Sequence, residues 1–148
     1  MSDPTAQFTA LIGRMTQAIC RGDPDAAAQC FTEDGVYHDG FYGAFKGRAA
    51  IAEMVRKHFY ADATDFAWEL SDAVSDGRIG YASYLFSYTA TMQGAEGRRI
   101  AFRGMSKVRL AGGLMTHYEE IFERAPVLAK LGFADERILK SVHKWARA

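Results

Sequence analysis

The sequence is poor in cysteine and proline, and it has neither a long apolar run nor an excess of charge of one sign. Only Cys20 and Cys30 occur in 148 residues, whereas small secreted domains usually depend on several disulfides. Eighteen basic and 18 acidic residues cancel, so no overall field favours nucleic acid or an anionic membrane. No apolar stretch is long enough to span a bilayer. We therefore expect neither a nucleic-acid partner nor a membrane span.

The first residues, MSDPTAQF, carry an acidic side chain and a proline where a secretory signal has a basic start and an apolar run. Together with the low cysteine content, this predicts a cytoplasmic protein. A chain of this length can bury about 70% of the surface that its unfolded form exposes. The sequence shows no linker, internal repeat or low-complexity segment. We expect one domain spanning residues 1–148.

Helical patterns occupy the two ends of the chain. Apolar residues near the start recur at the spacing of one helix face: Phe8, Leu11, Ile12, Met15 and Ile19. Asp23 and the proline after it predict a short second helix that buries Phe31 and ends in the turn TEDG. A third helix is expected from Gly47 to about Tyr60. Two more follow from Pro126 onward, the last with three apolar residues on its inner face: Ile138, Val142 and Trp145.

The middle of the chain alternates with a period of two, which is typical of strands. A short strand, GVYHD, precedes the third helix. Later, AWELSDAV, IGYASYLFSYTATM, RRIAFRGMSKVRL and LMTHYEEIFE are joined by glycine-containing turns and predict an antiparallel meander. Gly104, inside one of these strands, indicates a bulge or bend. The expected fold is α+β: a strongly curved antiparallel sheet, shaped as a cone-like half-barrel, packs against the N-terminal helices and carries a C-terminal helical extension.

The alternation also assigns side chains to the two faces of the sheet. In the strand from residue 79 to 92, we assign Tyr84, Phe86, Tyr88 and Met92 to the outer face and the intervening residues to the pocket. Because that outer face would be apolar, a second subunit is expected to cover it, which predicts a homodimer. In the last strand, Glu120 shares the inner face with two aromatic residues, Tyr118 and Phe122.

The order of elements and two motifs resemble the nuclear transport factor 2-like superfamily, specifically its SnoaL-like, polyketide-cyclase-like branch. The motifs are CRGDPDAAAQCFTEDGVYHDGFYGAFKGRAAI and GGLMTHYEEIFERAPVLAKLGF. The resemblance covers nearly the whole chain and implies the cone-shaped fold. That fold serves isomerases, cyclases, dehydratases, epoxide hydrolases and non-catalytic binders, so it does not determine the reaction.

The resemblance to the ketosteroid isomerases of this superfamily is partial. Asp39 matches their general base, although Gly40 replaces the proline that usually follows it. Met15 stands where they have an oxyanion-binding tyrosine, and Ser106 lies at or next to the position of their protonated acid. The resemblance therefore supplies a base without its oxyanion donors.

Two other enzyme types match the chain at different positions. Tyr37, Asp39 and Glu120 match three residues of the limonene epoxide hydrolases. Ser83 and Leu85 replace the remaining arginine and aspartate of that set. Glu120 also matches the acid/base aspartate of the aldol-condensing cyclases. None of these catalytic sets is complete.

The resemblance and the strand pattern together indicate four candidate catalytic residues: Asp39, Glu120, Tyr37 and Tyr118. An apolar pocket raises the pKa of a carboxyl toward the range of a general base, and a phenol can stabilise an enolate oxygen. Asp39 could instead cap backbone N–H groups before Gly40. Glu120 could face solvent if the strand alternation is displaced by one residue.

The most economical function is a cofactor-free isomerase, cyclase or dehydratase that acts on a small hydrophobic carbonyl compound. The alternative is a non-catalytic small-molecule-binding or interaction subunit. No metal or cofactor is expected, because the histidines lack paired-ligand spacing and the glycine clusters precede strands. The expected substrate pocket is further lined by Met15, Ile19, Phe41, Phe45, Phe59, Tyr81, Ser83, Leu85, Phe102, Ser106, Val108 and Phe122.

Overall fold

The computed structural model describes residues 3–148 and begins with the predicted helical region. Asp3 caps the first helix by accepting a hydrogen bond of 3.2 Å from the N–H of Thr5. Its apolar stripe, from Phe8 to Ile19, is buried against the sheet. The N-terminal helical elements are α1 (Pro4–Cys20), α2 (Pro24–Ala28), α3 (Arg48–Met54) and a π-helical continuation of α3, η1 (Val55–Phe59).

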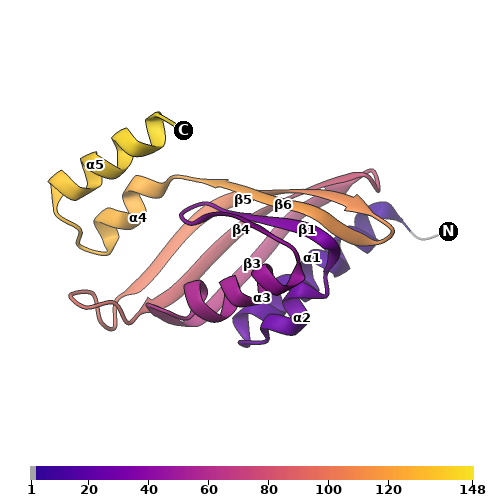
Figure 1. Ribbon diagram of the computed structural model, residues 1–148, viewed down its shortest axis with the longest axis horizontal. Helices are drawn as coiled ribbons and strands as arrows, with labels where there is room; N and C mark the ends of the chain where they lie inside the picture. Colours follow the sequence, from indigo (N-terminus) through magenta and orange to yellow (C-terminus); the bar gives the residue numbers. More distant parts are fainter. Residues whose placement is uncertain (1–2) are drawn as a thin grey trace.

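Six strands form one curved, unclosed sheet in the order β2-β1-β6-β5-β4-β3 (Figure 1). The four later strands form the predicted antiparallel meander, and the first helices pack along one side of it. β1 pairs with β2 as a hairpin and with β6 in parallel. The strands are β1 (Phe31–Asp39), β2 (Gly43–Lys46), β3 (Ala63–Ser75), β4 (Ile79–Ala90), β5 (Arg99–Ala111) and β6 (Leu114–Phe122).

The predicted turn TEDG is wrong, because these residues belong to β1. Phe31 pairs with Met115, and the next partners along the parallel ladder are Val36 and His117, so β1 bulges between them. Gly35 lies in this bulge, where an added Cβ would come within 2.9 Å of Phe31 and 3.1 Å of the carbonyl oxygen of Met115. The residues that suggested a turn therefore form an irregular strand.

Gly104 does not mark the bulge or bend that its position in the strand predicted. It pairs in register with Tyr84 of β4 and Phe122 of β6, and the irregularity of β5 falls later, between Arg109 and Leu110. Glycine is required for a different reason. The place of its missing Cβ is occupied by the ring of Tyr84.

The face assignment of β4 is reversed relative to the sequence expectation. Tyr84 and Phe86 are buried on the concave face, whereas Tyr81 is 41% exposed on the outside. The physical reason lies at the start of β4, where the ring of Phe8 in α1 fills the place of the missing Cβ of Gly80. This contact turns the even-numbered residues inward. The aromatic residues that suggested a dimer interface are therefore not on the outer face.

The chain ends in two helices, α4 (Arg124–Lys130) and α5 (Asp135–Ala146). α4 begins two residues before Pro126 and buries Val127 and Leu128. α5 lies beyond the sheet (Figure 1), and no residue of 135–146 is buried. Its main attachment is Trp145, which lies 6.3 Å from the ring of Phe41 and 4.1 Å from the guanidinium of Arg124. The expected inner packing of Val142 is wrong, since it is 37% exposed.

Within residues 3–148, no helix combines the length and the apolar character needed to cross a membrane.

Candidate functional site

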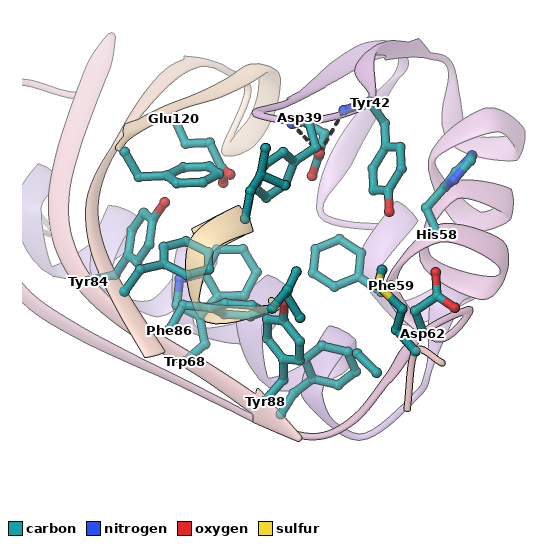
Figure 2. A pocket seen from close by; sticks show the side chains of 18 of the residues that line it. Asp39, Tyr42, His58, Phe59, Asp62, Trp68, Tyr84, Phe86, Tyr88 and Glu120 are labelled. Atoms are coloured by element: carbon teal, nitrogen blue, oxygen red, sulfur yellow. Dashed lines mark hydrogen bonds between the residues drawn. The ribbon is translucent and has the colours of Figure 1, made fainter. Parts of the chain in front are cut away.

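A cavity of about 260 Å³ opens on the concave face of the sheet, between η1 and the start of the C-terminal helices. Its walls are mainly aromatic, and Figure 2 shows their side chains converging on one space. Asp39 and Glu120 are at one end. The aromatic walls make the surroundings of both carboxyls poorly solvated.

Asp39, at the end of β1, points its carboxylate into this cavity (Figure 2). One carboxylate oxygen, Oδ2, accepts hydrogen bonds from the N–H groups of Phe41 at 2.9 Å and Tyr42 at 3.0 Å. These two bonds lower the pKa of Asp39, but burial outweighs them and the net shift is upward. Asp39 therefore caps the backbone and is also desolvated, so the two readings of the sequence are not exclusive.

Glu120 lies on β6, is partly buried, and lines the cavity. It also borders a second hollow, on the side of Glu119 and Arg124. Burial, followed by the negative charge of Asp39, raises its pKa to about 8. A hydrogen bond of 3.0 Å from the Tyr118 hydroxyl to Oε1 opposes this shift. A pKa of about 8 keeps Glu120 protonated at neutral pH. Asp39, whose carboxylate accepts two backbone N–H bonds, is the member of the pair that is better stabilised as the anion.

Behind Glu120 lies a buried group of hydroxyls. The Tyr118 hydroxyl is 2.8 Å from Ser106 Oγ; because Tyr118 donates to Glu120, Ser106 is the donor in this second bond. Tyr37 stacks on Tyr118 with ring centroids 4.6 Å apart. Neither tyrosine lines the cavity. Tyr118 supports Glu120 through its hydrogen bond, whereas the Tyr37 hydroxyl is buried without a partner among residues 3–148.

The predicted pocket residues are divided among three regions. Phe41, Phe59, Phe102 and Phe122 line the cavity. Met15, Ile19 and Val108 belong to the core under the helices, and Phe45 packs against that core. Ser106 is buried behind Glu120 and does not line the cavity. The structure places the remaining three on the outer face of β4, for the reason given above: Tyr81, Ser83 and Leu85.

The sequence pattern did not reveal the cavity residues contributed by β3 and β4. Trp68, Tyr84, Phe86 and Tyr88 all line the cavity. Within residues 3–148, the Tyr84 hydroxyl and the Trp68 indole N–H are buried without a hydrogen-bond partner. Gly80 is the sequence signal that could have identified the inner face of β4, since a small residue at the start of a strand permits a helix to approach that face.

The opposite end of the cavity is also polar. The rings of Tyr42 and His58 lie 4.5 Å apart, and both residues line the cavity together with Asp62. Burial, with the neighbouring Tyr42 and Asp62, raises the pKa of Tyr88 to about 12. The cavity thus has an aromatic middle and hydrogen-bonding groups at both ends (Figure 2).

In the part of the chain that the structure describes, no three His, Cys, Asp or Glu side chains are grouped so that they could hold a metal ion. The groups that meet the cavity and can exchange or donate protons are carboxyls, phenols, an indole and an imidazole.

Comparison with known proteins identifies the family. The sequence profile described as the SnoaL-like domain matches residues 12–118. No protein with a curated description matches the chain.

Several solved structures share the fold. A candidate polyketide cyclase from Xanthomonas campestris has 22% identity, covering 87% of this chain and 99% of its own, with a TM-score of 0.71. A protein with a ketosteroid isomerase-like fold from Catenulispora acidiphila, solved with trimethylamine, has 20% identity, coverages of 84% and 93%, and a TM-score of 0.75. An LEH-like epoxide hydrolase from M. tuberculosis has 15% identity, coverages of 95% and 97%, and a TM-score of 0.70. At these identities, the likeness concerns the fold.

Proposed function

Because the chain belongs to the SnoaL-like domain family of the nuclear transport factor 2-like superfamily, we propose that it is a cofactor-free enzyme that transfers protons on a hydrophobic carbonyl compound. The reaction is of the isomerase, cyclase or dehydratase type. The observation that carries this proposal is the carboxyl pair at the end of the aromatic cavity. Asp39 is suited to accept a proton and Glu120 to donate one at the same pH.

The first step is enolisation. Asp39 removes a proton from a carbon next to the carbonyl group, and the electrons of that C–H bond form a carbon–carbon double bond. The carbonyl π electrons move to the oxygen, which receives a hydrogen bond or a proton from Glu120. Return of the proton to another carbon gives isomerisation. Attack of the enol carbon on a second carbonyl gives cyclisation, and loss of a β-hydroxyl as water gives dehydration.

The cavity supports a flat, mainly apolar substrate. Phe59, Phe86 and Phe102 are packed at its middle, with Phe86 and Phe102 5.3 Å apart and Phe59 and Phe86 6.2 Å apart. Aromatic walls of this kind bind apolar rings well and exclude water from the carboxyls. Exclusion of water strengthens the charge interactions on which the proton transfer depends.

The proposal is tested with 2-acetylnaphthalene, which has a flat apolar body and one enolisable methyl ketone. In deuterated buffer, the wild-type protein should accelerate exchange of the methyl protons, followed by proton NMR. Asp39→Asn keeps the size of the side chain and an oxygen that can accept the two backbone N–H bonds, but it cannot accept the proton. Exchange should therefore fall to the buffer rate. Tyr81→Phe, which changes an exposed phenol on the outer face, is the control. Exchange at the buffer rate in the wild type would contradict an enzyme of this type.

A non-catalytic binding protein is the second candidate. It is favoured by the two backbone N–H groups that hold Asp39, because this arrangement also occurs in purely structural turns. The same experiment separates the two. A binding protein would take up 2-acetylnaphthalene without accelerating exchange, and Asp39→Asn would bind it equally well.

We also propose that the chain forms a homodimer through the outer face of the sheet. Met105 and Ile121 are register partners on β5 and β6, and they are 53% and 80% exposed. Val74, on β3, is another exposed apolar residue of this face, which also carries the ion pair between Lys107 and Glu119. A second copy of the chain would remove these side chains from water.

A further inference from the structure

Tyr84 is a buried phenol that faces the candidate site. It lies on β4, is 3% exposed and lines the cavity. Its hydroxyl has no hydrogen-bond partner among residues 3–148. Buried hydroxyls in native proteins rarely lack a hydrogen-bond partner. We therefore expect the Tyr84 hydroxyl to donate to an acceptor on a bound ligand.

The ring of Tyr84 is fixed by its neighbours. It occupies the place of the missing Cβ of Gly104, its register partner on β5. It also meets Trp68 edge-on, with centroids 5.8 Å apart, and Phe102 edge-on at 6.4 Å. A ring packed in this way cannot turn its hydroxyl to bulk solvent. The donor is therefore set in place before a ligand arrives, which is the condition for effective charge stabilisation.

The surroundings keep this hydroxyl protonated. Burial and the negative charges of Glu120 and Asp39 raise the pKa of Tyr84 far above its ordinary value. Figure 2 shows the Tyr84 hydroxyl directed toward the end of the cavity where Glu120 lies. Glu120 Oε1 already accepts from Tyr118, and at neutral pH Glu120 is itself a donor. Two donors at one end of an apolar cavity match a ligand oxygen that accepts from both.

We propose that the Tyr84 hydroxyl binds the carbonyl oxygen of the substrate, beside Glu120. The catalytic effect of this contact rests on the proposed function: the hydroxyl would stabilise the enolate oxygen that forms when Asp39 removes the proton. The binding contact itself requires no turnover. It supplies an oxyanion donor that Met15 and Ser106 do not provide from the core.

The contact is measured by infrared spectroscopy of 2-acetylnaphthalene labelled with carbon-13 at the carbonyl. A hydrogen bond lowers the carbonyl stretching frequency. The bound probe should therefore absorb at a lower frequency than in hexane, and Tyr84→Phe should return the band part of the way, since Glu120 remains. Tyr81→Phe removes a phenol from the opposite face of the same strand and should leave the band unchanged. The exchange rate of the probe should fall on the order of 100-fold in Tyr84→Phe.

The assignment would be overturned by a wild-type band at the hexane frequency, by an identical band in Tyr84→Phe, or by failure of the wild-type protein to bind the probe. A shift lost in Trp68→Phe instead would transfer the role to the indole N–H, which also lacks a partner within residues 3–148, and would likewise overturn it. Loss of proton exchange with a retained frequency shift would reject the proposed function and leave the contact standing.

A wild-type experiment covers the case in which Tyr84→Phe does not fold. 2-Isopropenylnaphthalene has nearly the same shape as 2-acetylnaphthalene, but a CH₂ group replaces the oxygen. A donor aimed at that oxygen should make the ketone bind about tenfold more tightly than the hydrocarbon, although the hydrocarbon leaves water more readily. Equal or tighter binding of the hydrocarbon would contradict the contact.

Discussion

The hydroxyl of Tyr118 donates a hydrogen bond of 3.0 Å to Glu120 Oε1, two residues further along the same strand. Since Oε1 accepts this bond, the proton of neutral Glu120 belongs on Oε2. Ser106 on β5 donates in turn to Tyr118, so a chain of hydroxyls leads from the core to the carboxyl at the cavity. This chain holds Glu120 in one orientation and moderates the rise of its pKa.

The first prediction concerns Tyr118→Phe. Removal of the hydroxyl takes away a bond that stabilises ionised Glu120, so the pKa of Glu120 should rise above about 8. The alkaline fall of the exchange rate should move to higher pH, and the free energy of unfolding should drop by about 1 kcal/mol. A pH profile of exchange and a urea denaturation series measure the two effects. An alkaline limb that stays in place would mean that Glu120 is not the acid.

The second prediction is a change in how stability depends on pH when Glu120 becomes Gln. The folded protein holds a proton on Glu120 up to a pH of about 8, whereas the unfolded chain releases it near 4.5. The free energy of unfolding should therefore fall as the pH rises between these values. Because glutamine does not titrate, the variant should gain up to a few kcal/mol relative to wild type on passing from pH 4 to pH 9.

Urea denaturation of wild type and Glu120→Gln at a series of pH values measures this difference. Asp39 also has a raised pKa, so a smaller fall should persist in the variant at acidic pH. Parallel stability curves for the two proteins would show that Glu120 is not desolvated in the folded state.

The third prediction tests the packing of Tyr84. An added methyl group in Gly104→Ala would overlap the Tyr84 ring and approach the carbonyl oxygen of Ile121 to 2.9 Å. We expect a loss of about 1–3 kcal/mol in stability and weaker binding of 2-acetylnaphthalene. Gly13→Ala is the matched control: the site is in α1 with nothing within 4 Å of the added Cβ, so this change should leave binding intact and stabilise the helix slightly. Equal effects of the two substitutions would contradict the close packing.

The fourth prediction concerns the dimer. Light scattering at micromolar concentration should give twice the chain mass of 16.4 kDa. Ile121→Asp places a charge at the exposed Met105–Ile121 pair of the outer face and should give the monomer mass. Leu139→Asp changes a residue on α5 that is 58% exposed, and it should leave the dimer intact. A wild-type protein of 16.4 kDa under these conditions would reject the interface.

Much of the fold could be predicted because its signals are local. The helical stripe from Phe8 to Ile19 buries one face of α1. In β6 the predicted alternation holds from Tyr118 onward, whereas Met115, expected on the outer face, is buried. Glu120 could be placed for this reason, since Tyr118 and Phe122 flank it on the inner face of the same strand.

The face assignment of β4 could not be obtained in the same way, because both of its faces carry apolar residues. The outcome depends on a contact between Phe8 and Gly80, which are far apart in the sequence. The donor role inferred for Tyr84 was hidden by this ambiguity. The raised pKa of Glu120 likewise depends on a charge brought from another strand by folding, that of Asp39.

A carbon-13 NMR titration of the Asp39 and Glu120 side-chain carboxyls tests the central claim of one ionised and one protonated carboxyl at neutral pH most directly. Spectra of Asp39→Asn and Glu120→Gln assign the two signals. The structure predicts a midpoint near 8 for Glu120 and one above the ordinary 3.8 for Asp39. A midpoint near 4.5 for Glu120 would leave both carboxyls charged at neutral pH, and one below 3.8 for Asp39 would remove it as the base; either result would contradict the proposed proton transfer.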